Sequence, residues 1–233
     1  MLHRLGALLD PALFWEYRVI LLKGLAVDGY VFLASATLAV LLAFAIAIAR
    51  LGRNTLLRAL ATAYAEFFRN TPEYILLVWV YYVVPVLLGQ LLATKVDISP
   101  YVASVLALGL AYSGFLSETV RAGILSVPRG QIEAALSLGL RRFQILQRII
   151  LPQALRRMLP EALNQFVSLF KATSFVSLVA VPDIMYQVSM IDTQEMRPIP
   201  LYTGAAVLYC VVIICASQSI QHLSERWRRR GWA

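Results

Sequence analysis

Long apolar stretches dominate this chain and restrict it to folds that are stable in a lipid bilayer. Of its 233 residues, 60% are hydrophobic and only 15% are charged, whereas soluble domains carry about 25% charged residues. A helix needs about 20 apolar residues to cross the hydrocarbon core of a membrane. We therefore predict an all-α integral membrane protein with about five transmembrane helices, at residues 27–49, 72–92, 100–122, 158–181 and 201–223.

The remaining segments divide the chain into three predicted parts. Residues 1–24 mix aromatic and charged side chains, as in an amphipathic helix that lies at the membrane surface. Residues 25–224 form a single transmembrane domain, and residues 225–233 form a basic tail. Cys210 and Cys215 lie in an apolar stretch, so we interpret them as small core residues without a disulfide or metal role.

The positions of the basic residues predict the orientation of the chain. If residues 121–157 lie in the cytoplasm, 15 of the 21 lysines and arginines fall on that side of the membrane and five lie outside. This distribution agrees with the positive-inside rule, so we expect the N-terminus outside and the C-terminus in the cytoplasm. We therefore interpret the net charge of +8 as a result of membrane topology, and not as a sign of a nucleic-acid partner.

Two polar patterns lie within the predicted spans. In the third span, Gly109, Ser113 and Ser117 recur every four residues, and such small side chains let helices approach closely. In the fourth span, polar residues recur at three- and four-residue steps along one side of the helix. A central lysine costs about 2.5–3.5 kcal/mol on insertion scales, so this polar stripe has to face other helices or water. Its members are Glu161, Asn164, Gln165, Ser168 and Lys171.

A polar, arginine-rich insert separates the third and fourth spans. Residues 129–160 begin with strong helix formers, and Gly139 then lets the helix relax or turn. From Phe143 onwards, apolar residues recur on one helix face, which predicts an amphipathic helix that Pro152 ends or kinks. Composition alone leaves two interpretations open: a solvated loop beside the membrane, or a surface that contacts a cytoplasmic partner.

The insert also carries a longer signature. Its residues are Glu133, Ala134 and Ala135, then Gly139, and further on Ile149, Leu151 and Pro152. This spacing resembles the EAA signature of the permease subunits of ATP-binding cassette (ABC) importers, and it is most similar to the polar amino-acid branch of that family. The resemblance extends from about residue 22 to residue 223.

The resemblance implies an ABC type I importer fold with a cytoplasmic EAA coupling helix between transmembrane helices 3 and 4. The implied assembly lies in the bacterial inner membrane and contains a second permease subunit, identical or related, two ABC ATPase subunits and an extracytoplasmic solute-binding protein. ATP would be used by the ATPase subunit, so this chain would bind no cofactor and would not itself be an enzyme. The residues expected at the ATPase contact are Glu133, Ala134, Ala135, Gly139, Leu140, Arg141 and Arg142. For the two arginines, attraction to anionic lipid headgroups is the alternative.

Motifs for other chemistry are missing from the sequence. It contains no G-x-x-x-x-G-K-[ST] phosphate loop, so we expect no ATP site in this chain. Its two histidines, His3 and His222, lie near the ends, and no Cys/His cluster offers metal ligands. Neither H-E-x-x-H nor G-x-S-x-G occurs, which disfavours a membrane protease or hydrolase.

Two further family patterns concern the substrate pathway. The pattern E-x-x-R-[GN]-T-P is matched by Glu66, Arg69, Asn70, Thr71 and Pro72. The i, i+3 spacing of Glu66 and Arg69 predicts that they pair, and Asn70-Thr71-Pro72 predicts a break between helices. The pattern K-D-T-S-L reads Lys171-Ala172-Thr173-Ser174-Phe175 here, so its acidic residue is absent. A zwitterionic amino acid needs donors for its carboxylate and an acceptor for its amine. The candidates for these roles are Glu118, Lys171, Thr173, Ser174 and Glu73.

Each of these side chains has a purely structural alternative. Glu118 would be a buried partner of Arg121 or Arg69, and Lys171 would pair with Glu118 or Glu161. Thr173 and Ser174 would bond to nearby helix carbonyls. We expect Asp183 to cap a short helix outside the membrane.

Three functions remain open from the sequence. The first is an ABC importer permease for a polar amino acid or a related compound such as an opine. The second is an ion-gradient-driven secondary transporter of small polar solutes, which the complete EAA signature disfavours. The third is a membrane scaffold without transport activity, which the polar stripe of the fourth span disfavours.

Overall fold

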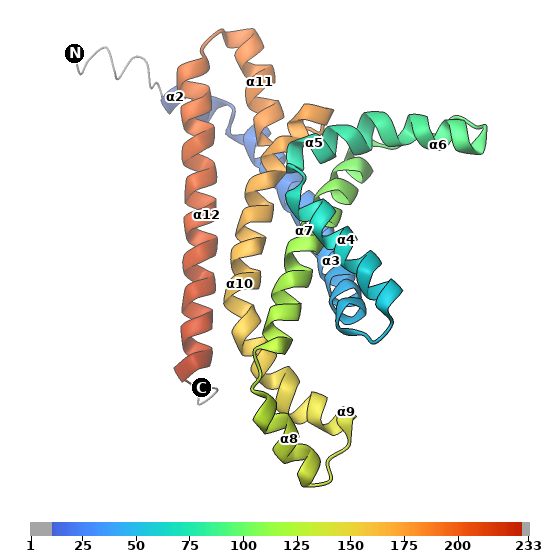
Figure 1. Cartoon of the computed structure of the whole chain (residues 1–233). Helices are drawn as coiled ribbons and strands as arrows, with labels where there is room; N and C mark the ends of the chain where they lie inside the picture. Colours follow the sequence, from blue (N-terminus) through green and yellow to red (C-terminus); the bar gives the residue numbers. More distant parts are fainter. Residues whose placement is uncertain (1–10, 230–233) are drawn as a thin grey trace. The chain divides into compact units, whose positions relative to one another are not determined.

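The computed structural model describes residues 11–229, and the side chains of residues 12–218, as helices joined by short connections (Figure 1). Five helical stretches in this part of the chain are long and apolar enough to cross a membrane, which confirms the predicted number. They are Arg18–Leu51, Glu73–Leu92, Pro100–Leu125, Arg142–Val179 and Pro198–Gln218. The first and fourth are longer than predicted, because their helices continue through the flanking polar residues.

The chain forms two compact units, and three long helices run from one unit into the other. The first unit contains Met1–Ser35, Glu73–Leu108 and Val167–Ala233, and the second contains Ala36–Pro72 and Gly109–Phe166. The shared helices are α3 (Arg18–Leu51), α7 (Pro100–Leu125) and α10 (Leu151–Ala172).

The first unit has its apolar core where the two ends of the chain meet. Leu13 of α2 (Pro11–Glu16) and Leu21 of α3 are buried against residues of α11 (Ile184–Glu195) and α12 (Pro198–Arg229). Tyr17, in the turn between α2 and α3, donates a hydrogen bond to Glu195 Oε1 at 2.6 Å. The buried residues of α11 and α12 in this core are Ile184, Val188, Ile191, Leu201 and Ala205.

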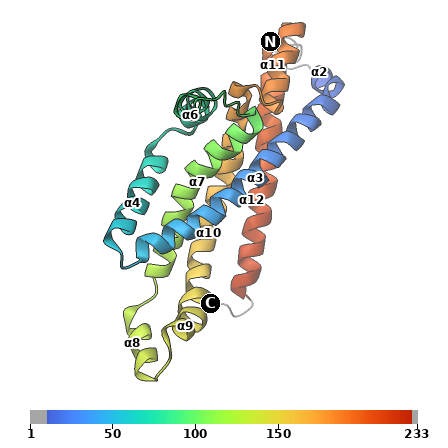
Figure 2. The ribbon, with the colours of Figure 1, turned by 90° about the vertical axis from the view of Figure 1, so that its right-hand side faces the viewer.

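The second apolar stretch is a continuous helix with one widened turn. It consists of α5 (Glu73–Val78), a π-helical turn η1 (Trp79–Val83) and α6 (Val84–Leu92). The widened turn directly precedes Pro85, because proline has no N–H to donate to the preceding turn. Figures 1 and 2 show α6 running across the direction of α12, which lies in the same unit.

In the second unit, α4 (Thr55–Asn70) folds back beside the C-terminal part of α3 (Figure 2). Asn54 caps its N-terminus, since the side-chain oxygen accepts from the amides of Leu56 and Leu57 at 3.0 and 3.2 Å. Asn70 and Thr71 end the helix by donating side-chain hydrogen bonds to the carbonyls of Glu66 and Phe67, both at 2.7 Å. This confirms the break predicted at Asn70-Thr71-Pro72.

Small residues let the helices of the second unit approach closely. Gly109 of α7 faces the side chain of Leu38, and Gly114 faces the backbone oxygen of Ala65. Ser113 is buried and hydrogen-bonds to the Tyr64 hydroxyl at 2.8 Å. The predicted small-residue seam is therefore a helix contact.

The insert folds as a helical hairpin, and of the two outcomes expected at Gly139 the chain turns there. It contains α8 (Arg129–Ser137), a turn at Gly139, and α9 (Arg142–Ile145), which continues through the π-helical turn η2 (Leu146–Ile150) into α10. Of the two outcomes predicted for Pro152, an end or a kink, the helix does not end there. Pro152 lies in the first turn of α10, where the widened turn before it accommodates the missing N–H.

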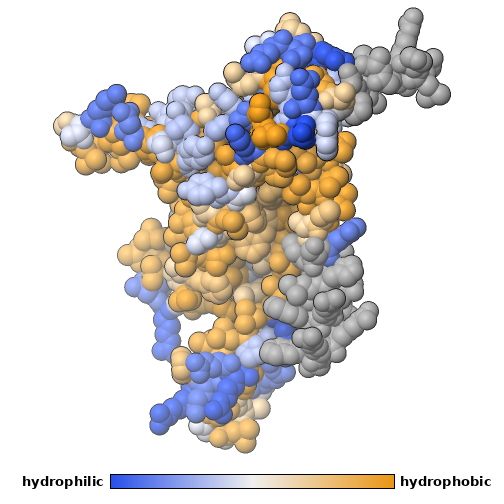
Figure 3. All heavy atoms as spheres, turned by 180° about the vertical axis from the view of Figure 1, so that it is seen from behind, coloured by the Kyte–Doolittle hydropathy of each residue, from blue (hydrophilic) through white to orange (hydrophobic). Residues whose placement is uncertain are grey.

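The cysteine interpretation also needs correction. Cys210 and Cys215 form no disulfide, as expected, but both are exposed on α12 and do not belong to the core. The reason is that α12 packs on its unit through Leu201, Ala205, Leu208 and Tyr209, and neither cysteine belongs to this face. Exposed apolar side chains are general on these helices, and Figure 3 shows them covering much of one face, with hydrophilic side chains both at the α8–α9 end and around α6 and α11. Such a surface is typical of helices that contact lipid or partner helices.

Candidate functional site

The turn between α8 and α9 explains why the signature has glycine at position 139. The Gly139 amide donates to Leu136 O at 2.9 Å, and the Leu140 amide donates to Ala135 O at 3.1 Å. These two bonds form a Schellman motif, which places the residue after the helix cap in the left-handed region. Gly139 has φ +78°, which glycine adopts without steric cost. The glycine therefore fixes where α8 ends and how the chain turns into α9.

The hairpin presents both charged and apolar side chains at its surface. Of the residues predicted to contact the ATPase, Glu133, Ala134, Gly139, Arg141 and Arg142 are exposed, Leu140 is half-buried and Ala135 is buried. Ala135 is small because it packs inside the hairpin. Two apolar side chains outside this predicted set are prominently exposed: Leu138, with 81% of its surface accessible, and Phe143, with 65%. An exposed apolar tip of this kind is typical of a protein contact.

Side-chain bonds hold the hairpin to the helices of its own unit. Gln153 of α10 donates to Gln131 of α8 at 2.7 Å, and Arg157 donates to the Ser126 carbonyl at the end of α7. The amide of Arg141 donates to the Gln144 side chain at 2.8 Å and so caps α9. These bonds connect the hairpin to α7 and α10.

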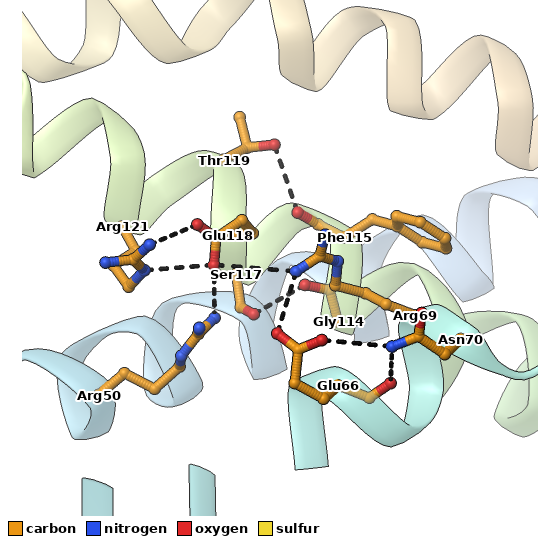
Figure 4. A network of polar contacts seen from close by, with 10 residues as sticks. All are labelled: Arg50, Glu66, Arg69, Asn70, Gly114, Phe115, Ser117, Glu118, Thr119 and Arg121. Atoms are coloured by element: carbon orange, nitrogen blue, oxygen red, sulfur yellow. Dashed lines mark hydrogen bonds and ion pairs between the residues drawn. The ribbon is translucent and has the colours of Figure 1, made fainter. Parts of the chain in front are cut away.

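Glu118 lies at the centre of a network of three arginines in the second unit (Figure 4). Arg121 donates to both carboxylate oxygens, at 2.6 and 3.2 Å. Arg50 Nη1 lies 2.8 Å from Glu118 Oε2, and Arg69 Nη1 lies 4.0 Å from the same oxygen. The pairing of Glu118 with Arg121 and Arg69 was expected as the structural alternative, whereas Arg50 from the end of the first span was not.

Arg69 links this network to α4. Its Nη1 lies 3.3 Å from Glu66 Oε1, as the sequence spacing predicted. The network thus holds three guanidinium groups and two carboxylates and joins α3, α4 and α7. Because buried charges are stable only when they are paired, these contacts fix the positions of the three helices at this point.

The polar stripe of α10 is mostly exposed in the described part of the chain. Glu161, Asn164, Ser168 and Lys171 are exposed, and Gln165 is half-buried and bonds to Glu161 at 2.9 Å. Within its own unit, the described part of the chain offers Lys171 no ion-pair partner.

The other predicted pathway residues differ in accessibility. Thr173 is buried and Ser174 is half-buried, and each donates its hydroxyl hydrogen to a carbonyl three residues earlier, at 2.8 Å, which was the structural alternative. Glu73 is half-buried in the first turn of α5, where a carboxylate suits the helix dipole.

The second unit also contains a hollow of about 290 Å³. It lies among side chains of α3, α7 and α10, including Phe44, Leu116 and Phe166, and its lining is apolar. Such a lining offers neither donors for a carboxylate nor acceptors for an amine, so the hollow is no candidate for a polar ligand.

Sequence reasoning missed a second polar centre, in the first unit. Asp28 of α3 accepts from the Tyr209 hydroxyl at 3.0 Å and from the Ile184 amide at 3.3 Å, and it is fully buried. Asp28 also interacts with Thr173. In the family pattern K-D-T-S-L the residue before this threonine is acidic, whereas here it is Ala172. Asp28 therefore places a carboxyl group beside the segment that lacks its own. The sequence did contain a signal for this centre, because Asp28 is an acidic residue inside an apolar stretch of membrane length. Ionisable residues in such stretches are by default candidates for a functional site.

Comparison with protein families identifies this architecture. A family model described as "Binding-protein-dependent transport system inner membrane component" matches residues 25–229. The chain belongs to this family. It is thus a multi-pass inner membrane permease subunit of the ABC importer kind, and the five spans, the hairpin and the signature residues are features of that permease.

Individual relatives match over most of the permease. The glutamate/aspartate import permease protein GltK of Escherichia coli O157:H7 is 32% identical over 208 residues, which cover 88% of this chain and 92% of the relative. The probable glutamine ABC transporter permease protein GlnM of Bacillus subtilis (strain 168) is 34% identical, covering 79% and 82%. The octopine transport system permease protein OccM of Rhizobium meliloti is 32% identical, covering 90% and 86%.

Solved structures share the fold of the permease. A crystal structure of an amino acid ABC transporter with histidines has a TM-score of 0.85 and 27% identity, and the match covers 93% of this chain and 98% of that one. The MetNI methionine ABC transporter in an inward-facing conformation has a TM-score of 0.68 at 18% identity, covering 91% and 97%, which shows the common fold. The type I importer fold expected from the signature is therefore confirmed.

Proposed function

We propose that this permease imports a polar amino acid, or a related compound such as an opine, and that ATP hydrolysis drives it through the α8–α9 hairpin. The observation that supports this proposal best is the hairpin itself. Its signature residues form a rigid Schellman turn, and Leu138 and Phe143 are exposed at its tip. The proposed assembly pairs two permease subunits with two ATPase subunits and takes its substrate from an extracytoplasmic binding protein. In this arrangement the N-terminus lies outside and the C-terminus in the cytoplasm.

The surface of the hairpin suits a docking contact with an ATPase subunit. Leu138 and Phe143 supply apolar anchors, and Glu133, Arg141 and Arg142 supply a charged rim that sets the orientation. ATP is bound and hydrolysed by the partner. When the ATPase subunits close, the hairpin moves with them, and its bonds to α7 and α10 pass that movement to the spans. Such coupling requires that the contact differ in free energy between the inward-open and outward-open states.

The polar stripe of α10 supports a polar substrate. The names of the relatives refer to glutamate, aspartate, glutamine and octopine, which all carry an α-carboxylate. Lys171 is exposed and lacks an ion-pair partner in its unit, so it is the proposed donor for that carboxylate. Ser174 and Thr173 are further donor candidates, and Glu73 and Glu118 are candidate acceptors for an amine. Of these, Glu118 already has its oxygens engaged by arginines, so its proposed part is to position the pathway helices.

The proposal is tested in proteoliposomes that contain the permease, its ATPase and its binding protein. Leu138→Asp places a charge at the apolar tip, so we expect ATP-driven uptake and co-purification of the ATPase to fall at least tenfold. Met196→Asp is the matched control, because Met196 is equally exposed, at 80%, but lies between α11 and α12. Full uptake by Leu138→Asp, or uptake driven by an ion gradient without ATP, would contradict the proposal.

A further inference from the structure

Two acidic side chains from distant parts of the sequence are buried together in the first unit. Asp28 lies in α3, and Asp183 precedes α11 as its N-cap. Neither has any accessible surface. The approach of the two elements depends on Gly24, because a Cβ atom there would lie 2.8 Å from the Ile184 amide nitrogen. The backbone at the start of α11 therefore packs directly against α3.

Each carboxyl group uses one oxygen and leaves the other without a partner. Asp28 Oδ2 accepts the bonds from Tyr209 and Ile184, and Asp183 Oδ1 accepts from the Tyr186 amide at 2.8 Å. Asp28 Oδ1 and Asp183 Oδ2 are buried and have no hydrogen-bond partner. A buried ionised carboxylate with a free oxygen costs several kcal/mol unless a cation or a donor satisfies it.

The surrounding elements supply no compensating charge. The groups that act on the two carboxyl groups include no lysine or arginine of the described part of the chain. The groups that act on the pair are the Tyr209 hydroxyl from α12, the Thr173 hydroxyl from η3 (Thr173–Val179) and the backbone amides at the start of α11. Thr173 already donates its only side-chain hydrogen to the Phe170 carbonyl. Asp28 Oδ1 and Asp183 Oδ2 therefore lack a donor among the described residues.

We propose that Asp28 and Asp183 form an acid pair that binds one proton at neutral pH, and that this proton holds α11 against α3. A neutral carboxyl group can donate a hydrogen bond, whereas a carboxylate can only accept one. With one proton bound, the pair carries one negative charge in place of two. The protein binds this proton from water and returns it to water when the pair ionises.

The electrostatics of Asp183 support this assignment. Burial raises the pKa of its carboxyl group to about 8, opposed by the hydrogen bond from the Tyr186 amide and reinforced by the charge of Asp28. Since this group binds a proton more tightly in the folded chain than in the unfolded chain, its contribution to stability is greatest at low pH and falls as the pH rises towards 8. The unfolding equilibrium constant rises by up to tenfold per pH unit in this window.

Infrared spectroscopy of the reconstituted full-length protein tests the proposal directly. A neutral carboxyl group has a C=O stretching band that disappears on ionisation, and we expect a band that titrates near pH 8. Asp28→Asn and Asp183→Asn keep the shape and the accepting oxygen, so both variants should fold, and asparagine remains an N-cap. The double variant should lack the titrating band, and Asp28→Asn alone should shift the midpoint of Asp183 to lower pH because the neighbouring charge is removed.

Thermal unfolding between pH 6 and 9 provides the second readout. The double variant should lose the decline of the unfolding temperature that the unmodified protein shows over this range. Asp97→Asn is the control, because Asp97 is exposed and paired with Lys95 at 3.4 Å, and it should leave the profile unchanged. Parallel profiles for the unmodified protein and the double variant, or no titrating band, would overturn the proposal. Stabilisation by sodium at alkaline pH that requires both aspartates would overturn it in favour of a metal cation.

Discussion

Arg50 and Glu118 form an ion pair whose Nη1 and Oε2 atoms lie 2.8 Å apart, and the arginine side chain is only 7% exposed. Arg50 Nε and Nη1 have no aligned hydrogen-bond acceptor, so the contact is mainly electrostatic. The second carboxylate oxygen of Glu118 is engaged by Arg121. The network of Glu118 is therefore stabilised mainly by the attraction between its opposite charges, at a point where α3 and α7 meet.

Neutralising Glu118 should destabilise the second unit. Glu118→Gln leaves the Arg50 charge buried without its partner, and we expect a loss of about 2–3 kcal/mol, somewhat less than for a fully buried pair because Glu118 is partly exposed. Glu66→Gln is the control, since Glu66 is half exposed and its pair with Arg69 should contribute at most about 0.5 kcal/mol. Thermal unfolding of the purified protein in detergent measures both. Equal effects of the two substitutions would contradict a central role of Glu118.

Replacing Gly139 should uncouple the transporter without unfolding it. Gly139→Ala forces a Cβ atom into φ +78°, at a cost of about 1–2 kcal/mol, and shifts the tip residues Leu138 and Arg141. We expect ATP-driven uptake to fall several-fold while the unfolding temperature changes little, because the turn is exposed. Gly139→Asn should be milder, since asparagine tolerates this conformation.

Gly130→Ala is the matched control for the turn. Gly130 lies in α8, a Cβ atom there would meet nothing within 4 Å, and its φ is not positive. Uptake should stay at the level of the unmodified protein. A loss of uptake in Gly130→Ala equal to that in Gly139→Ala would mean that the effect does not come from the turn.

Adding a methyl group at Gly24 should separate α3 from α11. In Gly24→Ala the new Cβ would lie 2.8–2.9 Å from backbone atoms of Asp183 and Ile184, which cannot move aside as a side chain can. We expect a loss of about 1–3 kcal/mol in the free energy of unfolding. Gly29→Ala, in the same helix with open space around it, should be neutral or gain up to about 1 kcal/mol from helix propensity. Chemical or thermal unfolding that ranks the two variants in the opposite order would refute the close approach.

Removing the charge of Lys171 should affect transport more than stability. If Lys171 binds the substrate carboxylate, Lys171→Gln should raise the apparent KM for uptake about tenfold or more, as expected for the loss of a charge-assisted hydrogen bond. Its unfolding temperature should not change, because the side chain is exposed and has no ion pair in its unit. Lys95→Gln, in an exposed loop, is the control. An unchanged KM in Lys171→Gln would remove Lys171 from the substrate pathway.

Local sequence patterns predicted most of the helices and one of the two polar centres. The spacing of Glu66 and Arg69 predicted their pair, and Asp183 was correctly expected to cap a helix. Arg50 was treated only as a charge that follows the first span, although it is the most buried member of the Glu118 network. Its partner lies on another helix, and helix periodicity carries no information about which helices meet.

Hydropathy, the positions of the arginines and the signature from Glu133 to Pro152 were enough to predict a five-span permease with a polar helical insert between the third and fourth spans. These features are properties of single segments, because a span needs only apolar length and a Schellman turn needs only its glycine. The tertiary structure alone brought Asp28 to the start of α11, where it accepts from an amide 156 residues away. Such contacts depend on how whole helices pack, so the buried acid pair emerged only when α3, α11 and α12 were assembled.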